Sequence, residues 1–349
     1  MEKTSRLEIE TFRQAAGSPK PEDVQLDLTL RPVSLLEFIG QTTIKSNLHV
    51  FIQAARKRKE SLDHILFFGP PGLGKTTLAY IVAREMKANI KVCSGPALTR
   101  PGDLAGLLTH LEEGDVLFID EIHRLNPVVE EYLYPAMEDF FIDIMIDKGP
   151  HSRSLKLNLP RFTLVGATTR SGLITSPLRA RFGIVERLNY YDNIELAEVV
   201  ERSAQILKVK IDKAAVAEIA RRSRGTPRIA NRLLKRVRDY AQVKAAGEIT
   251  HPVAEQGLAM LAVDHEGLDE MDRRILEYLW KECNGGPVGI NSLAAGLQEE
   301  AETLEEIYEP FLIQKGFLRR TASGRVLTRQ ACEHLGVKLS PAKQSELWK

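Results

Sequence analysis

The feature that most constrains this chain is a short apolar strand that runs directly into a glycine-rich loop. Residues 66–77 read LFFGPPGLGKTT and match the pattern G-x-x-x-x-G-K-[ST]. The glycines, Gly72 among them, let backbone N–H groups point at phosphate oxygens, and the following helix adds the positive end of its dipole. We expect Lys75 to bind the β- and γ-phosphates and Thr76 to ligate Mg²⁺. The apolar strand before the loop and the helical pattern after it argue against a glycine-rich turn with a chance lysine.

A second motif lies downstream, where residues 115–121 read DVLFIDE. A run of apolar strand formers that ends in two carboxylates is typical of a Walker B strand, because a parallel strand is buried on both faces and presents ligand groups at its C-terminal end. We expect Asp120 to hold Mg²⁺ through water and Glu121 to orient or deprotonate the attacking water. Together the two motifs predict hydrolysis of a nucleoside triphosphate.

Length and composition set the remaining limits. A chain of 349 residues is expected to hold two or three domains. With 48 Lys and Arg against 47 Asp and Glu, any contact with nucleic acid has to come from local patches. Three cysteines without C-x-x-C spacing suit a reducing compartment. No apolar run approaches the roughly 18 residues of a membrane span, so we expect a soluble cytoplasmic protein with no membrane contact.

The first two thirds of the chain alternate strands with helices. Residues 1 to about 29 are polar and expected to be flexible, and an amphipathic helix is predicted from Thr43 to about Arg58. Strands are predicted at 65–68, 90–93, 116–119, 162–167 and 184–188. The pattern predicts an α/β fold with a parallel sheet and helices, that is, a P-loop NTPase domain over residues 1–191.

Two alternating apolar runs between the second motif and the fourth of these strands predict a β-hairpin over residues 140–159. Alternation places Phe141, Asp143 and Met145 on one face and the isoleucines at 142, 144 and 146 on the other. Such an insertion is either a partly buried edge or a surface for a partner. The pattern alone leaves these two interpretations equally open.

Three side chains beyond the fourth strand are candidates for the reaction. Thr168 follows that strand at the edge where Asp120 is expected, and we predict that it senses the γ-phosphate. Arg179 and Arg181 precede the next strand. In an isolated domain they would be surface arginines, whereas in a ring-forming ATPase an arginine here reaches the neighbouring subunit's nucleotide and stabilises the transition state. The sequence does not decide which of the two arginines dominates.

Two smaller domains are predicted after residue 191. Residues 192–262 are helical and indicate a lid domain, in which Arg228 follows a proline-fixed helix start and is a candidate nucleotide sensor. After a linker at 264–267, residues 265–349 show three helices and a short hairpin, the order of a winged-helix head. The third helix is acidic, so the hairpin with Arg319, Arg320 and Arg325 is the better DNA surface. A charged turn in a protein-binding winged helix is the alternative.

With these residues in view, the chain closely resembles the RuvB family, the bacterial Holliday-junction branch-migration motors of the AAA+ class. The resemblance spans roughly residues 30–335. Its specific stretches are FIDEIHRL at 118–125, LYPAMED at 133–139, RGTPRIANR at 224–232 and LIQKGFL at 312–318. The first 29 residues and residues 340–349 match no part of the family pattern.

The resemblance implies binding of ATP and Mg²⁺ and assigns roles residue by residue. It implies contacts with the base at Leu30 and Arg31, and contacts with phosphate and Mg²⁺ at Gly72, Lys75, Thr76 and Thr77. It implies further nucleotide contacts at Glu138, Asp139, Phe140 and Tyr191, a neighbour-directed Arg181, a sensor Arg228, and DNA contacts at Arg320 and Arg325.

It also implies a homohexameric ring that encircles duplex DNA, acts on four-way junctions in recombination, DNA repair and the SOS response, and works with RuvA and later with the resolvase RuvC. The hairpin at 140–159 would then bind RuvA. A clamp-loader-like or DNA-binding switch that uses ATP only to assemble is the alternative function. DNA-stimulated ATP turnover with junction dissociation distinguishes the motor from the switch.

Overall fold

The computed structural model describes residues 29–145 and 154–338, and the chain divides into two compact units, Leu30–Tyr191 and the chain from Asp192 onward. The expected flexibility of residues 1 to about 29 concerns positions that lie almost wholly outside the described residues. The turn of the predicted hairpin, which includes Ile146, lies outside them as well. No helix in the described ranges is long and apolar enough to cross a membrane.

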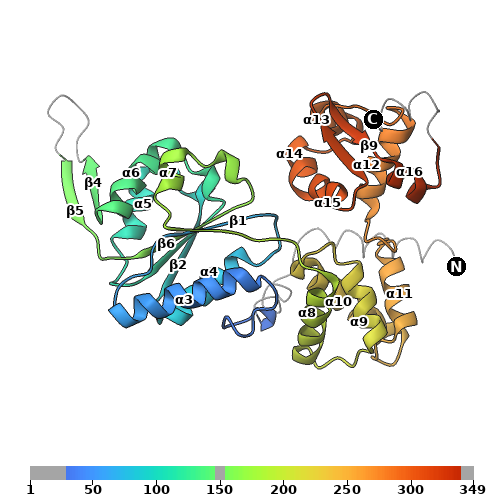
Figure 1. Ribbon diagram of the computed structural model, residues 1–349, viewed down its shortest axis with the longest axis horizontal. Coiled ribbons are helices and arrows are strands. Elements are labelled where there is room, and N and C mark those ends of the chain that lie inside the picture. The colour runs from blue at the N-terminus through green and yellow to red at the C-terminus, as the bar shows by residue number, and fades with distance from the viewer. Residues whose placement is uncertain (1–28, 146–153, 339–349) are drawn as a thin grey trace. The chain divides into compact units, whose positions relative to one another are not determined.

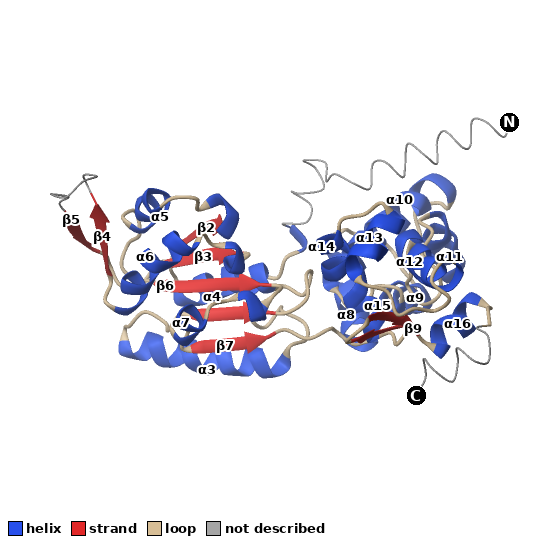
Figure 2. Ribbon diagram, turned by 90° about the horizontal axis from the view of Figure 1, so that it is seen from above, coloured by secondary structure: helices blue, strands red, loops and turns tan. Residues whose placement is uncertain are grey.

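The first unit is built on a parallel sheet of five strands in the order β2-β3-β6-β1-β7 (Figure 2). Its elements are α3 (Thr42–Arg58), β1 (Ile65–Phe68), α4 (Lys75–Met86), β2 (Ile90–Ser94), the 3₁₀ helix η1 (Gly95–Ala97), α5 (Pro101–Leu108), β3 (Val116–Asp120), the 3₁₀ helix η2 (Ile122–Arg124), α6 (Pro127–Glu138), β4 (Phe141–Met145), β5 (Ser154–Asn158), β6 (Thr163–Thr168), the 3₁₀ helix η3 (Ser171–Leu173), α7 (Ser176–Ala180) and β7 (Ile184–Arg187). The five predicted sheet strands, the helix at α3 and the parallel-sheet class are confirmed.

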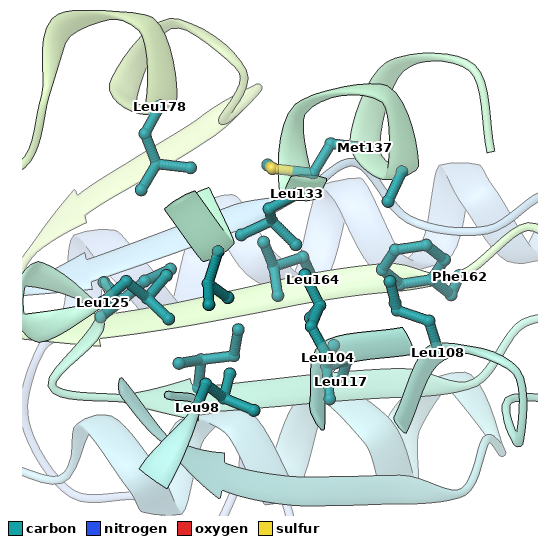
Figure 3. Packing of buried hydrophobic residues seen from close by; sticks show 14 of the residues in the cluster. Leu98, Leu104, Leu108, Leu117, Leu125, Leu133, Met137, Phe162, Leu164 and Leu178 are labelled. Carbon is teal, nitrogen blue, oxygen red and sulfur yellow. The ribbon is translucent and has the colours of Figure 1, made fainter. Parts of the chain in front are cut away.

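Helices cover both faces of this sheet, with α3 and α4 on one side and α5, α6 and α7 on the other (Figure 1). On the second face Leu117 and Leu164 pack with Leu104, Leu133 and other buried side chains from the covering helices (Figure 3). Strand β6 is buried at all six positions, in keeping with its nearly unbroken apolar run. The core therefore fixes the strand ends that carry the candidate site.

The hairpin β4–β5 stands away from the sheet (Figures 1 and 2). Its antiparallel register pairs Ile142 with Leu157 and Ile144 with Leu155. Ile142 is fully buried in the core and Leu157 packs against it, whereas Leu155 is 47% exposed. On the opposite face the Lys156 ammonium lies 3.5 Å from the centre of the Phe141 ring. The isoleucine face is therefore buried at its base, at Ile142, and exposed further out, at Leu155. The sequence pattern, which left a buried edge and a partner surface equally open, did not separate these two parts of the face.

The second unit holds a helical group and a winged-helix group. The helical group consists of α8 (Asn193–Ile206), α9 (Lys213–Arg221), α10 (Pro227–Lys244) and α11 (His251–Met260). The winged-helix group consists of α12 (Glu270–Lys281), α13 (Ile290–Leu297), α14 (Ala301–Thr303), the π-helical turn η4 (Leu304–Tyr308), α15 (Glu309–Gln314), β8 (Leu318–Thr321), β9 (Gly324–Leu327) and α16 (Arg329–Leu335). The expected third head helix is therefore interrupted by a π-helical turn, and helices α11 and α16 were not predicted.

A buried ionic contact joins the two groups of the second unit. Arg224, which is 7% exposed and has a positive φ of 55°, donates to Asp269 at 2.8 Å and to the fully buried Asp272 at 2.9 Å. Its guanidinium also lies 4.3 Å from the centre of the Phe311 ring. Burial raises the pKa of Asp272 to about 7, against the opposing effect of Arg224. The predicted linker at 264–267 is accordingly bridged by side chains on both sides.

Candidate functional site

The glycine-rich loop has a backbone that only glycine adopts without strain. Gly69, Gly72 and Gly74 have φ values of 138°, 80° and 102°. A Cβ at Gly69 would lie 2.5 Å from the carbonyl oxygen of Leu188, which in turn is held to β1 because its N–H donates to Phe68 at 2.8 Å. The loop therefore packs against the segment that follows β7, in the open conformation that phosphate binding by backbone N–H groups requires.

Lys75 is the first residue of α4, and its side chain crosses the loop. The ammonium donates to the carbonyl oxygens of Gly69 at 2.7 Å and Pro70 at 2.8 Å, and the residue is only 7% exposed. Thr77 is half-buried in the same first helical turn. A cation and a helix N-terminus thus meet inside one loop, which is the charge arrangement that binds phosphate.

The sheet register brings the two motifs together at one edge. Phe68, the last residue of β1, is paired with Thr168, the last residue of β6, while Asp120 ends the adjacent strand β3. The Thr76 hydroxyl lies 3.5 Å from Asp120 Oδ2. These two oxygen-bearing side chains face each other as the protein ligands of one hard cation would.

Glu121 follows at a sharp turn. Its φ is 48°, its N–H donates to Asp120 Oδ1 at 2.9 Å, and its carboxylate pairs with Arg124 at 3.1 Å. The side chain is 45% exposed, so water reaches it. The left-handed conformation of Glu121 thus ends strand β3 directly after Asp120.

Thr168 is 1% exposed and is held by two neighbours. Its hydroxyl lies 2.9 Å from His123 Nδ1 and accepts a hydrogen bond from the Arg170 N–H at 2.9 Å. His123 was not among the predicted site residues, although its place two residues after Glu121 was a usable signal.

The resemblance also implies nucleotide contacts at Leu30 and Arg31, on the base side, and at Tyr191. Leu30 is 3% exposed and Arg31 is half-buried. The Tyr191 hydroxyl donates to the carbonyl oxygen of Leu73 at 3.3 Å, and a Cβ at Gly74 would lie 2.9 Å from the Phe38 ring. Tyr191 and Phe38 therefore contact the loop, and the contacts of Leu30, Arg31 and Tyr191 with a nucleotide stay predictions.

Arg181 belongs to a second cluster, built on α6 and α7. It donates to Glu138 at 3.1 Å and to the carbonyl oxygen of Pro177 at 2.8 Å, and its guanidinium stacks on Tyr134 at 4.2 Å. Its Nε is buried and donates to no acceptor in the described residues. By contrast Arg179 is exposed. In the described parts of the chain, no hydrogen bond or ion pair joins Arg181 to the loop or to Asp120.

Asp139 and Phe140 follow Glu138 at the end of α6. Asp139 is exposed, and Phe140 packs edge-on against Phe162 at 5.9 Å between ring centres. His64 anchors this end of the helix: its Nδ1 accepts from the Leu164 N–H at 2.9 Å, so its Nε2 donates to the Met137 carbonyl oxygen at 3.0 Å. Burial lowers the pKa of His64.

Arg228 lies in the second unit, at the start of α10. Thr226 caps this helix by accepting from the Ile229 N–H, and Pro227 occupies the first turn. Arg228 itself is exposed. Its role toward the nucleotide stays a prediction.

The two arginines predicted to contact DNA differ sharply in exposure. The Arg320 side chain is 60% exposed, whereas Arg325 is 5% exposed and forms ion pairs with Glu305 and Glu309. Burial alone would lower the pKa of Arg325, but the hydrogen bonds that it donates to Glu309 and Glu305 raise the pKa. The sequence did not predict the burial of Arg325, because the acidic segment indicates repulsion of phosphate but does not indicate that Glu305 and Glu309 lie against Arg325.

A glycine-rich phosphate loop and an acidic strand end, on a parallel sheet that is followed by a helical group, define a P-loop ATPase of the AAA+ class. Residues 30–188 match the model of the Holliday junction DNA helicase RuvB P-loop domain, 191–264 that of the RuvB AAA lid domain, and 265–336 that of the RuvB C-terminal winged helix domain. The chain belongs to the RuvB family.

Solved structures agree with this assignment. The Thermotoga maritima RuvB Holliday junction branch migration motor is 53% identical, with a TM-score of 0.82, over 89% of this chain and 100% of that chain. A singly substituted variant of the same protein is 53% identical with a TM-score of 0.84, over 89% of this chain and 99% of that chain.

Proposed function

We propose that the protein is an ATP-driven motor of Holliday-junction branch migration that acts in homologous recombination and DNA repair. The observation that carries the proposal is the meeting of the phosphate loop, Asp120 and Thr168 at one sheet edge, in a chain that ends in a RuvB-type winged helix. ATP hydrolysis at that edge supplies the free energy for moving DNA.

Nucleotide binding falls to the loop and to the residues around it. Backbone N–H groups at Gly72 and the start of α4, with Lys75 and Thr77, bind the phosphates of ATP. Leu30 and Arg31 lie on the base side, and Tyr191 makes a further contact with the nucleotide. The positive φ values of the loop glycines and the place of Lys75 across the loop support these roles.

Mg²⁺ would be held by Thr76 and Asp120, and when bound it neutralises charge on the phosphates. The donor set fits this ion, because Mg²⁺ is usually held by one or two protein oxygens together with substrate phosphates and water. The 3.5 Å between the two side chains supports a shared role.

Glu121 positions the attacking water and accepts its proton, while Thr168 donates its hydroxyl hydrogen toward the γ-phosphate. The exposure of Glu121 and the burial of Thr168 suit these separate tasks, since one side chain must meet water and the other must hold a fixed geometry.

Arg181 acts on the nucleotide of a neighbouring subunit in a homohexameric ring, with Glu138, Asp139 and Phe140 on the same face. Two observations support this: the cluster makes no described contact with its own phosphate loop, and the Arg181 Nε has no acceptor within the described residues. Arg228 senses the nucleotide from the lid.

The head binds duplex DNA through the hairpin that carries Arg320 and Arg325: Arg320 is exposed to phosphate, and Arg325 holds the hairpin in place through its buried ion pair with Glu309. The hairpin at 140–159 binds RuvA, and RuvC resolves the junction afterward. The exposure of Leu155, which lies on the apolar face of the hairpin, supports the RuvA contact. We propose that the protein acts in the cytoplasm, where such a motor meets its DNA.

The test compares turnover with junction movement. The motor is expected to hydrolyse ATP faster with duplex DNA and to dissociate a four-way junction with RuvA and ATP, and Glu121→Gln is expected to bind ATP without moving the junction. Junction dissociation at wild-type rate by Glu121→Gln would favour a switch that needs binding only. Electron microscopy with an ATP analogue and duplex DNA tests the hexameric ring.

A further inference from the structure

Four charged side chains of the head form one network between the hairpin β8–β9 and the acidic segment that faces it. Arg325 Nη2 donates to Glu305 Oε1 at 2.7 Å and to Glu309 Oε2 at 2.8 Å. Arg320 Nη2 donates to the same Glu305 Oε1 at 3.3 Å. The strand register pairs Arg320 with Arg325 across the hairpin. Two positive and two negative charges therefore cancel at the surface proposed to meet DNA.

The inner and outer halves of this network differ in exposure. The Arg325 and Glu309 side chains are 7% and 6% exposed, whereas those of Arg320 and Glu305 are 60% and 28% exposed. Breaking a buried ion pair is strongly unfavourable, because it leaves an uncompensated charge away from water. An exposed pair is weak and is screened by salt. The inner pair is thus fixed, and the outer pair is free to exchange.

A second carboxylate oxygen lies near Arg320. Glu309 Oε1 is buried, forms no hydrogen bond in the described residues, and lies 4.0 Å from Arg320 Nη1. A phosphate that approaches Arg320 from solvent meets the negative field of both glutamates. Any DNA contact by Arg320 therefore competes with carboxylates of the same domain.

We propose that Glu305 is an exchangeable counterion that DNA phosphate displaces from Arg320, and that this competition lowers the affinity of the head for duplex DNA. The inference rests on the proposed DNA role of the hairpin. The fixed Arg325–Glu309 pair keeps the hairpin in place while the outer arginine changes partner. A weak grip suits a protein that must release each phosphate before it binds the next.

The experiment measures duplex affinity of the full-length protein over a series of salt concentrations by fluorescence anisotropy. Glu305→Gln keeps an oxygen acceptor for Arg325 but removes the charge, and it is expected to tighten binding about two- to fivefold, the range of one exposed ion pair. The dependence of log affinity on log salt should steepen by about one unit. Glu300→Gln is the matched control, since Glu300 forms no ion pair with either arginine in the described chain.

A double-variant cycle assigns the effect to Arg320. In an Arg320→Ala background, Glu305→Gln is expected to change affinity no more than Glu300→Gln does. Glu305→Asp keeps the charge and shortens the side chain, and it serves as a second variant if Glu305→Gln lowers the thermal midpoint of the head. It is expected to tighten binding less than Glu305→Gln.

The outcomes separate the inference from the proposed function. If Arg320→Ala leaves duplex affinity unchanged, the hairpin is not the DNA surface, so the proposed DNA role of the hairpin and the counterion role of Glu305 both fail. If Arg320→Ala weakens binding but neither Glu305 variant tightens it beyond the Glu300 control, the DNA role stands and the counterion role is overturned.

Discussion

The hairpin β4–β5 offers a sharp division between core and partner surface on a single face. Ile142 is fully buried at its base, and Leu155, on the same face one register step further out, is 47% exposed. We predict that Ile142→Ala destabilises the ATPase unit with little direct effect on a partner, and that Leu155→Ala does the reverse. The isoleucines at 144 and 146 do not serve this test, because their side chains lie outside the described residues.

The expected magnitudes follow from burial. Removing a fully buried isoleucine side chain costs about 2–5 kcal/mol of folding free energy. In a domain of this size each kcal/mol lowers the midpoint by about 2–4 °C, so the fall is roughly 4–20 °C. Leu155→Ala is expected to change stability by about 0.5 kcal/mol. If Leu155 is a central anchor for RuvA, its loss costs about 2 kcal/mol of binding, or roughly 30-fold in Kd.

Three measurements decide the matter: thermal unfolding, affinity for RuvA, and ATP turnover on duplex DNA without RuvA. Val92→Ala is the control, because Val92 is also 47% exposed but lies on β2. Unchanged RuvA affinity for a folded Leu155→Ala variant would refute the docking surface, and an unchanged midpoint for Ile142→Ala would refute the burial argument.

Further outcomes are expected for variants at four places: the ATP site, Arg181, the head hairpin and His64. Lys75→Ala should abolish ATP binding or turnover in a folded protein, and Glu121→Gln should retain binding but not turnover, as ATP-binding and phosphate-release assays will show. Arg181→Ala should lower turnover by about 10³-fold, and mixing it with Lys75→Ala subunits should restore some activity at mixed interfaces; rings shown to mix without any recovery would exclude action in trans. Arg320→Ala should weaken duplex binding equally for unrelated sequences and reduce the salt slope by about one. A sequence-selective loss of binding by Arg320→Ala would instead indicate base readout. Arg325→Ala should lower the free energy of unfolding of the head by about 3–5 kcal/mol, because Glu309 loses its buried partner. Burial lowers the pKa of His64 in the folded protein. Its stabilising contribution is therefore complete above the unfolded pKa of about 6.5 and is lost as pH falls below that value. Between about pH 7.5 and pH 5.5, the urea midpoint should therefore fall less in His64→Gln than in the unsubstituted protein.

The sequence predicted the sheet well because its strands carry apolar runs that few other structures accommodate. It also predicted the meeting of Thr76 and Asp120, since the two motifs follow the carboxyl ends of parallel strands of one sheet, β1 and β3, which share an edge although β6 lies between them. It did not predict the burial of Arg325, which depends on Glu309 approaching from a segment sixteen residues earlier. Likewise, the contact between His123 and Thr168 joins positions 45 residues apart that no local pattern connects.

The missed elements have similar causes. Helix α11 begins at His251-Pro252 and contains Gly257, which weakens the helical signal, yet Gly257 lets the helix approach Val237 closely. The turn η4 carries an extra residue in the helical ladder between α14 and α15. Periodicity within a short window cannot indicate where one helix will be interrupted for the sake of packing on another.

The Arg224 contact makes the boundary after the helical group a stiff joint. Arg224 stands four residues before Arg228, the candidate sensor, and its guanidinium is buried against Asp269 and Asp272 at the start of α12. Bending at 264–267 would expose or separate these charges, while Asp264 also accepts from the Leu268 N–H at 2.9 Å and pairs with His334. A displacement of the segment that holds Arg228 is therefore expected to move helix α12, the first helix of the head, with it, because the ion pairs of Arg224 connect the two directly.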